Sequence, residues 1–366
     1  MILENKIGLH LKGDLALKNI LVTGGCGFMG SHFVELLLSQ DIEKIIIIDK
    51  LSYAGNMKNV EKALKNPKCK FYLSDIAHPE IAHILRVEKI DTIVNFAAET
   101  HVDRSITHPK AFLETDILGL FNLAYWAMKT RVKTFLQIST DEVYGSIEKG
   151  EADELYPLNP TSPYSASKAA GELLLQSYHK TYGLPLIIVR CCNNFGPRQY
   201  PEKLIPMVIT RVLNKKLAFL HGEGAEQREW IYVKNCAERI LETLLCRKIG
   251  GIYNIGSGFR GTNEQLIKLI ISNILLPKGY CISYDDMNIL FNEWVEKISN
   301  RPNNDKRYAI NCDNFKKNIY PFLNYKQETG EQYLWDTIEW YKNNPDWWEG
   351  VVDLDSNLYK KGESLR

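Results

Sequence analysis

The stretch Thr23-Gly24-Gly25-Cys26-Gly27-Phe28-Met29-Gly30 decides the fold. It follows the apolar run Ile20 to Thr23 and precedes a segment with helical periodicity, Ser31 to Leu38. Glycines at this spacing permit a tight turn, close approach of a pyrophosphate to the backbone, and close packing of helix on strand. A glycine triplet also occurs in ordinary turns of α/β proteins, but the strand-turn-helix setting predicts a dinucleotide site.

The next apolar run, Lys44 to Ile48, ends in Asp49, where a ribose-binding acid is expected in such a unit. A carboxylate there accepts a hydrogen bond from a ribose 2′-hydroxyl and repels a 2′-phosphate. The sequence therefore predicts NAD rather than NADP, despite the neighbouring Lys50.

Similar apolar runs alternate with helix-period segments through the first half of the chain, and such runs are typical of strands buried on both faces. They are Lys70 to Leu73, Thr92 to Phe96, Thr134 to Ile138 and Leu186 to Val189. The predicted fold class is α/β, a doubly wound parallel sheet with a second, smaller α/β substrate-binding domain. The predicted division has an N-terminal extension (1–18), an NAD-binding domain (19–200 plus 229–260), a substrate-binding domain (201–228 plus 261–345), for which the resemblance described below implies a sugar nucleotide, and a tail (346–366).

Composition and charge exclude several classes of function. Of 366 residues, 45% are apolar and 24% charged, and the formal net charge is +1, so no global field attracts nucleic acid or an anionic membrane. The first 19 residues lack the apolar core of a signal peptide, and no run is long enough for a membrane span. Eight cysteines without C-x-x-C spacing indicate free thiols, and eight histidines show no metal-ligand spacing. We expect a cytoplasmic protein without a metal.

The segment Pro109 to Lys129 is apolar around nearly its whole circumference. A helix with one solvated face would carry polar residues on that face. It is expected either to be sandwiched inside the domain or to pack on the sheet and on a second subunit.

Two polar segments follow predicted strands, where open α/β sheets place ligands. One is Ser139-Thr140-Asp141-Glu142-Val143-Tyr144-Gly145, whose adjacent acids can face one ligand only if the strand ends there and the chain turns. The other is Tyr164-Ser165-Ala166-Ser167-Lys168, whose Tyr and Lys share one helical face. The lysine ammonium and a nicotinamide cation are expected to lower the pKa of Tyr164 and make it a base.

Taken together, these motifs resemble the extended short-chain dehydrogenase/reductase family, and within it the nucleotide-diphosphate-glucose 4,6-dehydratases. The resemblance runs from about Ile20 to Trp340 and includes the segments 49–56, 96–105, 140–142, 164–168, 193–197, 201–206 and 228–230. It implies a Rossmann-type fold, NAD, a hydro-lyase acting on dTDP-glucose or UDP-glucose on the way to rhamnose or another deoxysugar, and a homodimer formed through a four-helix bundle.

The resemblance also implies roles for the reactive residues. Tyr164 would deprotonate the carbon 4 hydroxyl while NAD takes hydride, and Thr140 would orient that hydroxyl. Glu142 would remove the proton on carbon 5, protonated Asp141 would be the acid for the departing carbon 6 hydroxyl, and the hydride would return to carbon 6. Lys168 would bind the cofactor ribose and tune Tyr164, and His101 would support the loop beside the cofactor.

The binding residues implied by the resemblance fall into two sets. The cofactor set is Gly24, Gly27, Phe28, Met29, Gly30, Asp49, Lys50, Asp75, Ile76, Ala97, Ala98, Thr115, Tyr164, Lys168 and Asn194. The substrate set is Thr100, Asn193, Lys203, Leu204, Arg228, Asn263, Arg301 and Asn304. The family's R-P-G-H-D stretch appears here as Arg301-Pro302-Asn303-Asn304-Asp305. This departure leaves thymine or uracil open as the base, and we expect UDP-glucose to serve as well as dTDP-glucose or better.

Other functions are weighed against this interpretation. A sugar-nucleotide epimerase would lack the acid pair, and a related decarboxylase usually has Ser at the position of Asp141. A catalytically inactive NAD-sensing protein would be expected to have lost Tyr164, Lys168 or the acids, all of which are present.

Overall fold

The structure, a computed structural model, describes residues 17–319 and 330–350. The expected N-terminal extension lies almost entirely outside the described residues, and so does most of the expected tail.

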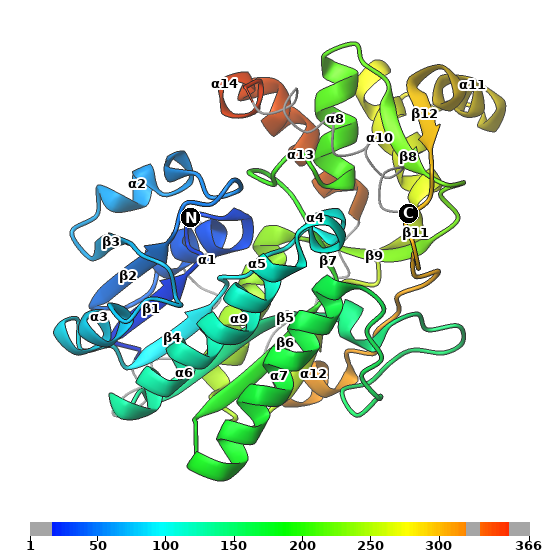
Figure 1. The fold of residues 1–366 in the computed structure, drawn as a ribbon. Helices are drawn as coiled ribbons and strands as arrows, with labels where there is room; N and C mark the ends of the chain where they lie inside the picture. The colour runs from blue at the N-terminus through cyan, green and yellow to red at the C-terminus, as the bar shows by residue number, and fades with distance from the viewer. Residues whose placement is uncertain (1–16, 320–329, 351–366) are drawn as a thin grey trace.

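A parallel sheet of seven strands is the centre of the larger part of the molecule (Figure 1). Its strands, in spatial order, are β3 (Cys69–Leu73), β2 (Lys44–Asp49), β1 (Asn19–Thr23), β4 (Thr92–Asn95), β5 (Thr134–Thr140), β6 (Leu186–Cys191) and β10 (Ile252–Ile255). The predicted strands are confirmed, and β10 pairs in parallel with β6, so the chain returns to this sheet late. The doubly wound α/β fold predicted from the sequence is therefore correct.

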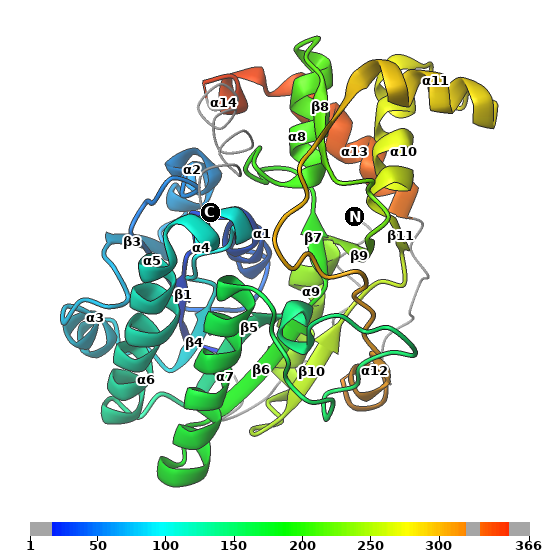
Figure 2. The same ribbon diagram turned by 45° about the vertical axis from the view of Figure 1, so that its right-hand side comes forward.

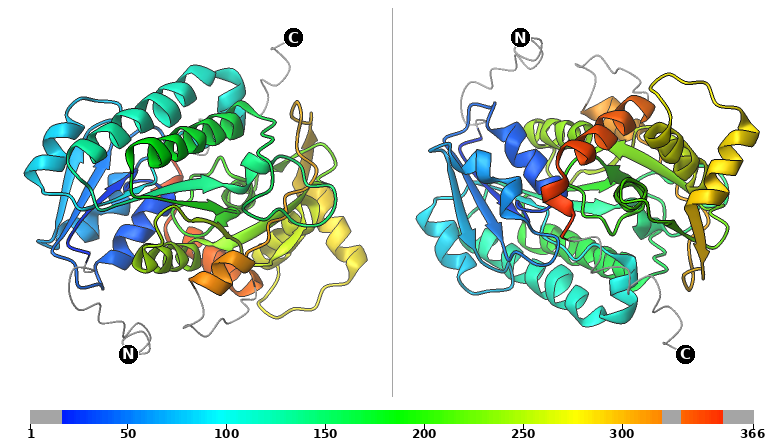
Figure 3. Two further views of the ribbon diagram at one scale, coloured as in Figure 1. Left: turned by 90° about the horizontal axis from the view of Figure 1, so that it is seen from below. Right: turned by 90° about the horizontal axis from the view of Figure 1, so that it is seen from above.

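Helices cover both faces of this sheet (Figure 3). Alternate residues of one strand enter different cores: Ile45 and Ile47 pack in one hydrophobic cluster, whereas Ile46 and Ile48 pack in another. The first cluster includes α1 (Phe28–Leu37) and α9 (Val233–Cys246), and the second includes α3 (Ile81–Val87), α6 (Leu120–Lys129) and α7 (Pro163–Tyr182). Shorter elements are η1 (Met57–Asn59), α2 (Glu61–Leu64), α4 (Val102–Thr107), α5 (Pro109–Leu113), η2 (Glu114–Gly119), η3 (Asp141–Tyr144) and α12 (Asp313–Asn318). Two covered faces explain why the strands are continuously apolar.

The smaller part gathers at one end of the larger one (Figure 2). It has a three-stranded sheet, β11 (Arg260–Thr262), β9 (Gln227–Tyr232) and β7 (Asn193–Phe195), and a pair, β12 (Val295–Ile298) and β8 (Ala218–His221). Its helices are α8 (Leu204–Leu213), α10 (Asn263–Leu275), α11 (Tyr284–Trp294), α13 (Gly330–Asn343) and α14 (Pro345–Trp348). These elements share a hydrophobic core of their own.

The two cores suggest where the division between domains lies. Phe195 and Trp230 pack in the core of the smaller part, whereas Ile310 and Phe315 pack in the core beneath the large sheet. We propose that the substrate-binding domain takes in β7 and β9, and that residues 310–319 belong with the NAD-binding domain.

The long apolar segment is continuous helix through α5, η2 and α6, with η2 a π-helical insertion. Leu113, Leu118 and Phe121 are 52%, 58% and 41% exposed, so the helix is not sandwiched within the chain. One of its faces packs inward and the other is apolar and open.

All eight cysteines are free thiols. Over residues 17–319 and 330–350, no cluster of three or more His, Cys, Asp or Glu side chains could hold a metal ion. No described helix has the length and apolar character needed to cross a membrane.

Candidate active site

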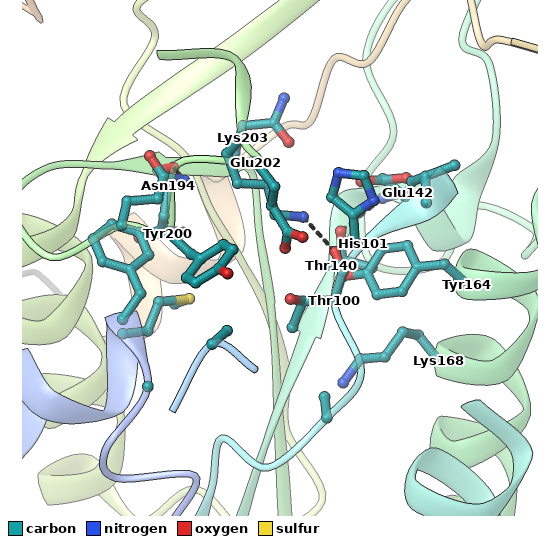
Figure 4. A pocket seen from close by; sticks show the side chains of 18 of the residues that line it. Thr100, His101, Thr140, Glu142, Tyr164, Lys168, Asn194, Tyr200, Glu202 and Lys203 are labelled. Atoms are coloured by element: carbon teal, nitrogen blue, oxygen red, sulfur yellow. Dashed lines mark hydrogen bonds between the residues drawn. The ribbon is translucent and has the colours of Figure 1, made fainter. Parts of the chain in front are cut away.

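A pocket of about 410 Å³ runs from the turn after β1 to the loop after β12. Every residue predicted to bind cofactor or substrate lines it. Of the five predicted catalytic residues, Thr140, Glu142, Tyr164 and Lys168 line the pocket, and Asp141 does not. In Figure 4 the side chains of Thr140, Glu142 and Tyr164 gather on one side, and Asn194 and Tyr200 lie on the other.

The turn after β1 is shaped for close contact with a ligand. Gly24 has φ +65°, and a Cβ added there would lie 2.7 Å from the backbone nitrogen of Ala97. A Cβ on Gly30 would lie 2.3 Å from the carbonyl oxygen of Gly24, so only glycine lets helix α1 begin this close to the strand. Helix α1 starts at Phe28, and its N-terminus faces the pocket wall formed by this turn.

Asp49 holds the same turn from the end of β2. Its Oδ2 accepts a hydrogen bond from the backbone N–H of Cys26 (2.9 Å), and its Oδ1 accepts one from that of Leu51 (2.8 Å). Asp49 is only 8% exposed, and this burial raises the pKa of its carboxyl. A glycine cradle that a Cβ would fill, beside an acid on a pocket wall, fits the adenosine half of a dinucleotide.

Lys50 links two other predicted cofactor residues, Thr115 and Asp75, with Glu99 in one cluster. Its Nζ donates to Thr115 Oγ1 (2.9 Å) and lies 3.0 Å from Glu99 Oε1 and 3.7 Å from Asp75 Oδ2. Its ammonium is therefore paired with carboxylates rather than available to a 2′-phosphate.

The acid pair lies where the chain turns, as the sequence requires. Strand β5 ends at Thr140, and η3 begins at Asp141. Thr140 caps this turn: its Oγ1 accepts a hydrogen bond from the backbone N–H of Glu142 (3.2 Å) and donates to Asp141 Oδ1 (3.3 Å). The two acids therefore lie beyond the end of the strand, so their side chains need not point to opposite faces of the sheet.

The two acids have different surroundings. Asp141 is 2% exposed, and its Oδ2 has no hydrogen-bond partner among the described residues. Burial, followed by the charges of Glu142 and Glu229, raises its pKa well above 3.8, which favours the protonated carboxyl. Burial also raises the pKa of Glu142, but Lys203, Arg228 and Arg301 oppose that rise. One acid is therefore suited to donate a proton and the other to accept one.

Tyr164 and Lys168 lie on the pocket-facing side of α7, as predicted. The Lys168 ammonium donates to the Ile138 carbonyl (3.1 Å), and Thr140 hydrogen-bonds the Tyr164 hydroxyl. The expected lowering of the Tyr164 pKa included the charge of a nicotinamide cation, and the chain by itself gives the opposite direction. Burial, then the charges of Glu142 and Asp116, raise it well above 10.

Asp116 is a buried acid beneath this pair that the sequence interpretation missed. It is 4% exposed, its Oδ2 accepts from Ser167 Oγ (2.8 Å), and its Oδ1 accepts from the Glu99 backbone N–H (3.2 Å). Burial raises its pKa to about 6, although the Lys168 charge opposes this. Its charge adds to burial and to the charge of Glu142 in raising the pKa of Tyr164. The sequence signal that could have indicated it is the presence of an acidic residue within the apolar segment Pro109 to Lys129.

Cations from the smaller part line the substrate side. Lys203 donates to the Thr100 carbonyl, the contact drawn as a dashed line in Figure 4. Arg228 donates to the Asp305 carbonyl (2.7 Å) and stacks on the Tyr308 ring. Arg301 forms a two-point ion pair with Asp103, both contacts at 2.7 Å. Three cations on one wall suit a diphosphate.

Amide groups form a second cluster at the far end of the pocket. Glu226 accepts from Asn304 Nδ2 (2.9 Å), from Asn300 Nδ2 (3.2 Å) and from Asn263 Nδ2 (3.5 Å). The Asn304 amide also donates to Asn300 Oδ1 (2.9 Å). Glu226, which the sequence interpretation did not single out, therefore orients two of the predicted substrate residues.

Two residues that line the pocket, Glu202 and Tyr308, were not predicted. Tyr53 donates to Glu202 Oε1 (2.8 Å) and Arg104 to Glu202 Oε2 (3.2 Å), so Glu202 ties the loop after β2 to the smaller part. Tyr308 donates to Asp305 Oδ2 (2.8 Å) and lies 3.4 Å from Glu142 Oε2. Tyr53, Arg104 and Glu202 stand inside motifs that were noticed, whereas Tyr308 has no local signal.

His101, expected to support the loop beside the cofactor, lines the pocket at the start of α4. It is the N-cap of α4, and its Nδ1 accepts from the Arg104 backbone N–H (3.4 Å). Burial holds its pKa well below 6.5, so the ring stays neutral.

Comparison with known proteins places this geometry in a family. A family model described as GDP-mannose 4,6 dehydratase matches residues 21–332. The dTDP-glucose 4,6-dehydratase of Escherichia coli is 37% identical over 359 residues, covering 91% of this chain and 96% of that protein. A low-salt glycan biosynthesis protein of Haloferax volcanii is 42% identical over 300 residues, covering 81% and 91%.

A solved structure gives the same result. The dTDP-glucose 4,6-dehydratase of Streptomyces venezuelae, crystallised with NAD, has a TM-score of 0.83 and 37% identity, and the match covers 91% of this chain and 99% of that one. By its fold, its Thr-Asp-Glu turn and these matches, this chain belongs to the nucleotide-sugar 4,6-dehydratase family.

Proposed function

We propose that this protein removes water from the glucose unit of a nucleoside diphosphate-glucose and forms the 4-keto-6-deoxy sugar nucleotide. The observation that carries the proposal is the pair Asp141 and Glu142, placed by the turn after β5 next to Tyr164. An epimerase needs only the tyrosine and a cofactor, whereas elimination of water needs an acid and a base in addition.

The cofactor is proposed to be NAD. The glycine cradle and Asp49 support it, and so does the NAD in the related crystal structure. Held by the glycine turn and Asp49, NAD would supply the hydride acceptor for carbon 4 and the hydride donor for carbon 6. Since the cycle regenerates it, NAD is expected to co-purify with the protein, and stimulation by NADP above that by NAD would contradict this assignment.

The residues of the chain then divide the proton transfers. Tyr164, hydrogen-bonded to Thr140, accepts the proton of the carbon 4 hydroxyl. The ketone formed there makes the hydrogen on carbon 5 acidic, and Glu142 removes it as a proton. Asp141, kept protonated by burial, delivers a proton to the carbon 6 hydroxyl, which leaves as water. Glu142 returns a proton to carbon 5 as hydride adds to carbon 6, and the proton taken by Tyr164 makes up for the one given by Asp141, so the net change is loss of one water.

On the substrate side, Lys203, Arg228 and Arg301 are proposed to hold the diphosphate, and Asn263 and Asn304 to face the nucleoside. We propose dTDP-glucose as the donor, which the names of the relatives support, with UDP-glucose as the alternative. The ratio of kcat/KM for the two donors decides between them. The product would be an intermediate for rhamnose or another deoxysugar made in the cytoplasm.

The test is to incubate the protein with each donor separately and to follow the mass of the sugar nucleotide. The proposal predicts loss of one water. An epimerase would leave the mass unchanged, a decarboxylase would act on a uronic acid with loss of carbon dioxide, and an NAD-sensing protein would leave both donors intact.

A further inference from the structure

The C-terminal helices contact both parts of the molecule. Helices α13 and α14 pack in the core of the smaller part, where Tyr341 and Trp348 are 0% and 3% exposed. Yet α14 lies against η1 of the larger part: Trp347 Nε1 donates to Asn59 Oδ1 (2.9 Å), and Lys58 Nζ donates to the Asp346 carbonyl (3.1 Å). Figure 3 shows α14, at the red end of the chain, beside the blue elements.

Asn59 connects this contact to the turn after β1. It is 6% exposed, and its Nδ2 donates to the Cys26 carbonyl (2.9 Å) while its Oδ1 accepts from Trp347. Its own carbonyl accepts from Arg198 (2.9 Å), whose other terminal nitrogen reaches Glu35 on α1 (2.8 Å). Both ends of the Asn59 side-chain amide are therefore paired, which fixes its orientation.

Cys26 stands in the middle of the glycine turn, and both sides of its backbone are held. Its N–H donates to Asp49, the predicted ribose-binding acid, and its carbonyl accepts from Asn59 and from the Asn56 backbone N–H (3.1 Å). Neither Asn59 nor Trp347 lines the pocket. Their effect on a ligand must therefore pass through the position of the turn.

We propose that Trp347 and Asn59 are positioning residues for the cofactor, a relay in which α14 holds the phosphate-binding turn in its ligand-ready conformation. The inference rests on the proposed function, since it concerns how the same site binds NAD. Donors that are already oriented bind an anion without the cost of ordering the turn first, so loosening the relay weakens cofactor affinity.

The test compares two tryptophan variants of the full chain after bound nucleotide has been removed. Trp347→Phe keeps a ring against Trp340, whose centroid lies 5.2 Å away, and loses only the indole N–H. Trp348→Phe is the matched control, because its indole N–H donates to the Tyr341 carbonyl (2.8 Å) within the C-terminal helices. Isothermal titration calorimetry measures the Kd for NAD and, separately, for dTDP and UDP.

For Trp347→Phe we expect the Kd for NAD to rise about 3- to 10-fold, the effect of losing one partly buried hydrogen bond. The Kd for the nucleoside diphosphates and the kcat at saturating NAD should stay within about 2-fold, as should every constant of Trp348→Phe. Asn59→Asp keeps the acceptor for Trp347 but loses the donor to Cys26, so it should weaken NAD at least as much.

Equal changes in NAD affinity for the two tryptophan variants would show a general loss of packing and overturn the relay. Unchanged NAD affinity in Trp347→Phe would overturn it as well. If the wild-type chain itself fails to bind NAD, the proposed function is contradicted and the relay falls with it, so the two failures are distinguishable.

Discussion

Asp141 and Glu142 are neighbours in the chain, but their carboxyls differ in what surrounds them. Asp141 is withdrawn from the pocket wall and close to Glu229, whereas Glu142 lines the pocket and faces three cations. Burial raises the pKa of both carboxyls, but Lys203, Arg228 and Arg301 oppose the rise at Glu142, so Asp141 is the better suited to act as an acid and Glu142 as a base.

Glu142→Gln and Asp141→Asn are therefore expected to fail at different steps. Without the base, the hydrogen on carbon 5 stays in place, so deuterium from the solvent should not enter there. Without the acid, exchange at carbon 5 continues while water loss slows by roughly 10² to 10⁴-fold. Mass spectrometry in deuterated water measures both.

Tyr164→Phe is the control for this pair, since it should suppress even the reduction of the cofactor. Wild-type dehydration by Asp141→Asn, or normal carbon 5 exchange by Glu142→Gln, would contradict the assignment.

Asp116 predicts a pH dependence of stability. Its pKa is raised from 3.8 to about 6 in the folded chain, so the folded state binds its proton more tightly than the unfolded state does. Stability from this group is present at low pH and is lost as pH rises from about 4 to about 6. Relative to wild type, Asp116→Asn should gain up to about 3 kcal/mol in unfolding free energy between pH 4 and pH 7.

Urea unfolding at several pH values measures this difference. Glu114→Gln changes an exposed acid of the same helical segment, η2, and should show no such trend. Parallel profiles for Asp116→Asn and wild type would refute the prediction.

At the scale of elements, the π-helical insertion η2 and helix α7 pack backbone against backbone. A Cβ on Gly171 would lie 2.9 Å from the Asp116 carbonyl oxygen and 2.9 Å from Leu120 Cδ2. π-helical turns are rare and often occur at functional sites. Here the turn carries Asp116 towards Ser167, next to Lys168, the proposed partner of Tyr164.

Gly171→Ala is expected to lower the unfolding free energy by about 1 to 3 kcal/mol, because the carbonyl cannot move aside cheaply. Without a clash, a Gly→Ala change within a helix would raise the unfolding free energy by about 1 kcal/mol. The sign of the measured change therefore shows whether the close contact exists. The kcat should fall too, since α7 carries Tyr164 and Lys168. Ser177→Ala, on the exposed side of α7, should leave the kcat unchanged.

At the scale of the whole molecule, an apolar face remains open on η2, α6 and α7. It consists of Leu118, Phe121, Tyr125 and Leu173, which are 58%, 41%, 38% and 57% exposed. A contiguous apolar face on adjacent helices is typical of an interface. We propose that a second copy of the chain covers it and forms a four-helix bundle with the same two helices.

Light scattering at micromolar concentration should give twice the mass of one chain. Phe121→Glu combined with Leu173→Glu should give the mass of one chain, because two charges would be buried in the interface. Leu155→Glu, at a loop residue 92% exposed and outside this face, is the control. A single-chain mass for the wild-type protein would refute the dimer.

The sequence by itself determined where the strands lie along the chain and which reactive residues follow them. The alternation of apolar runs and the glycine spacing are local patterns, and the side-chain periods of strand and helix convert them directly into a doubly wound sheet with its phosphate turn. Thr140, Glu142, Tyr164 and Lys168 were found in this way, because each stands within a few residues of a strand end or helix start.

Only the tertiary structure determined the pKa shifts of the ionisable groups and the contacts between residues distant in the sequence. A pKa depends on burial and on neighbours distant in sequence, which is why the Tyr164 pKa rises instead of falling and why Asp116 escaped notice. Tyr308 at Glu142 and Trp347 at Asn59 come together across more than 160 residues. Such pairings leave no period in the sequence, since packing of whole elements alone brings the two residues within hydrogen-bond distance.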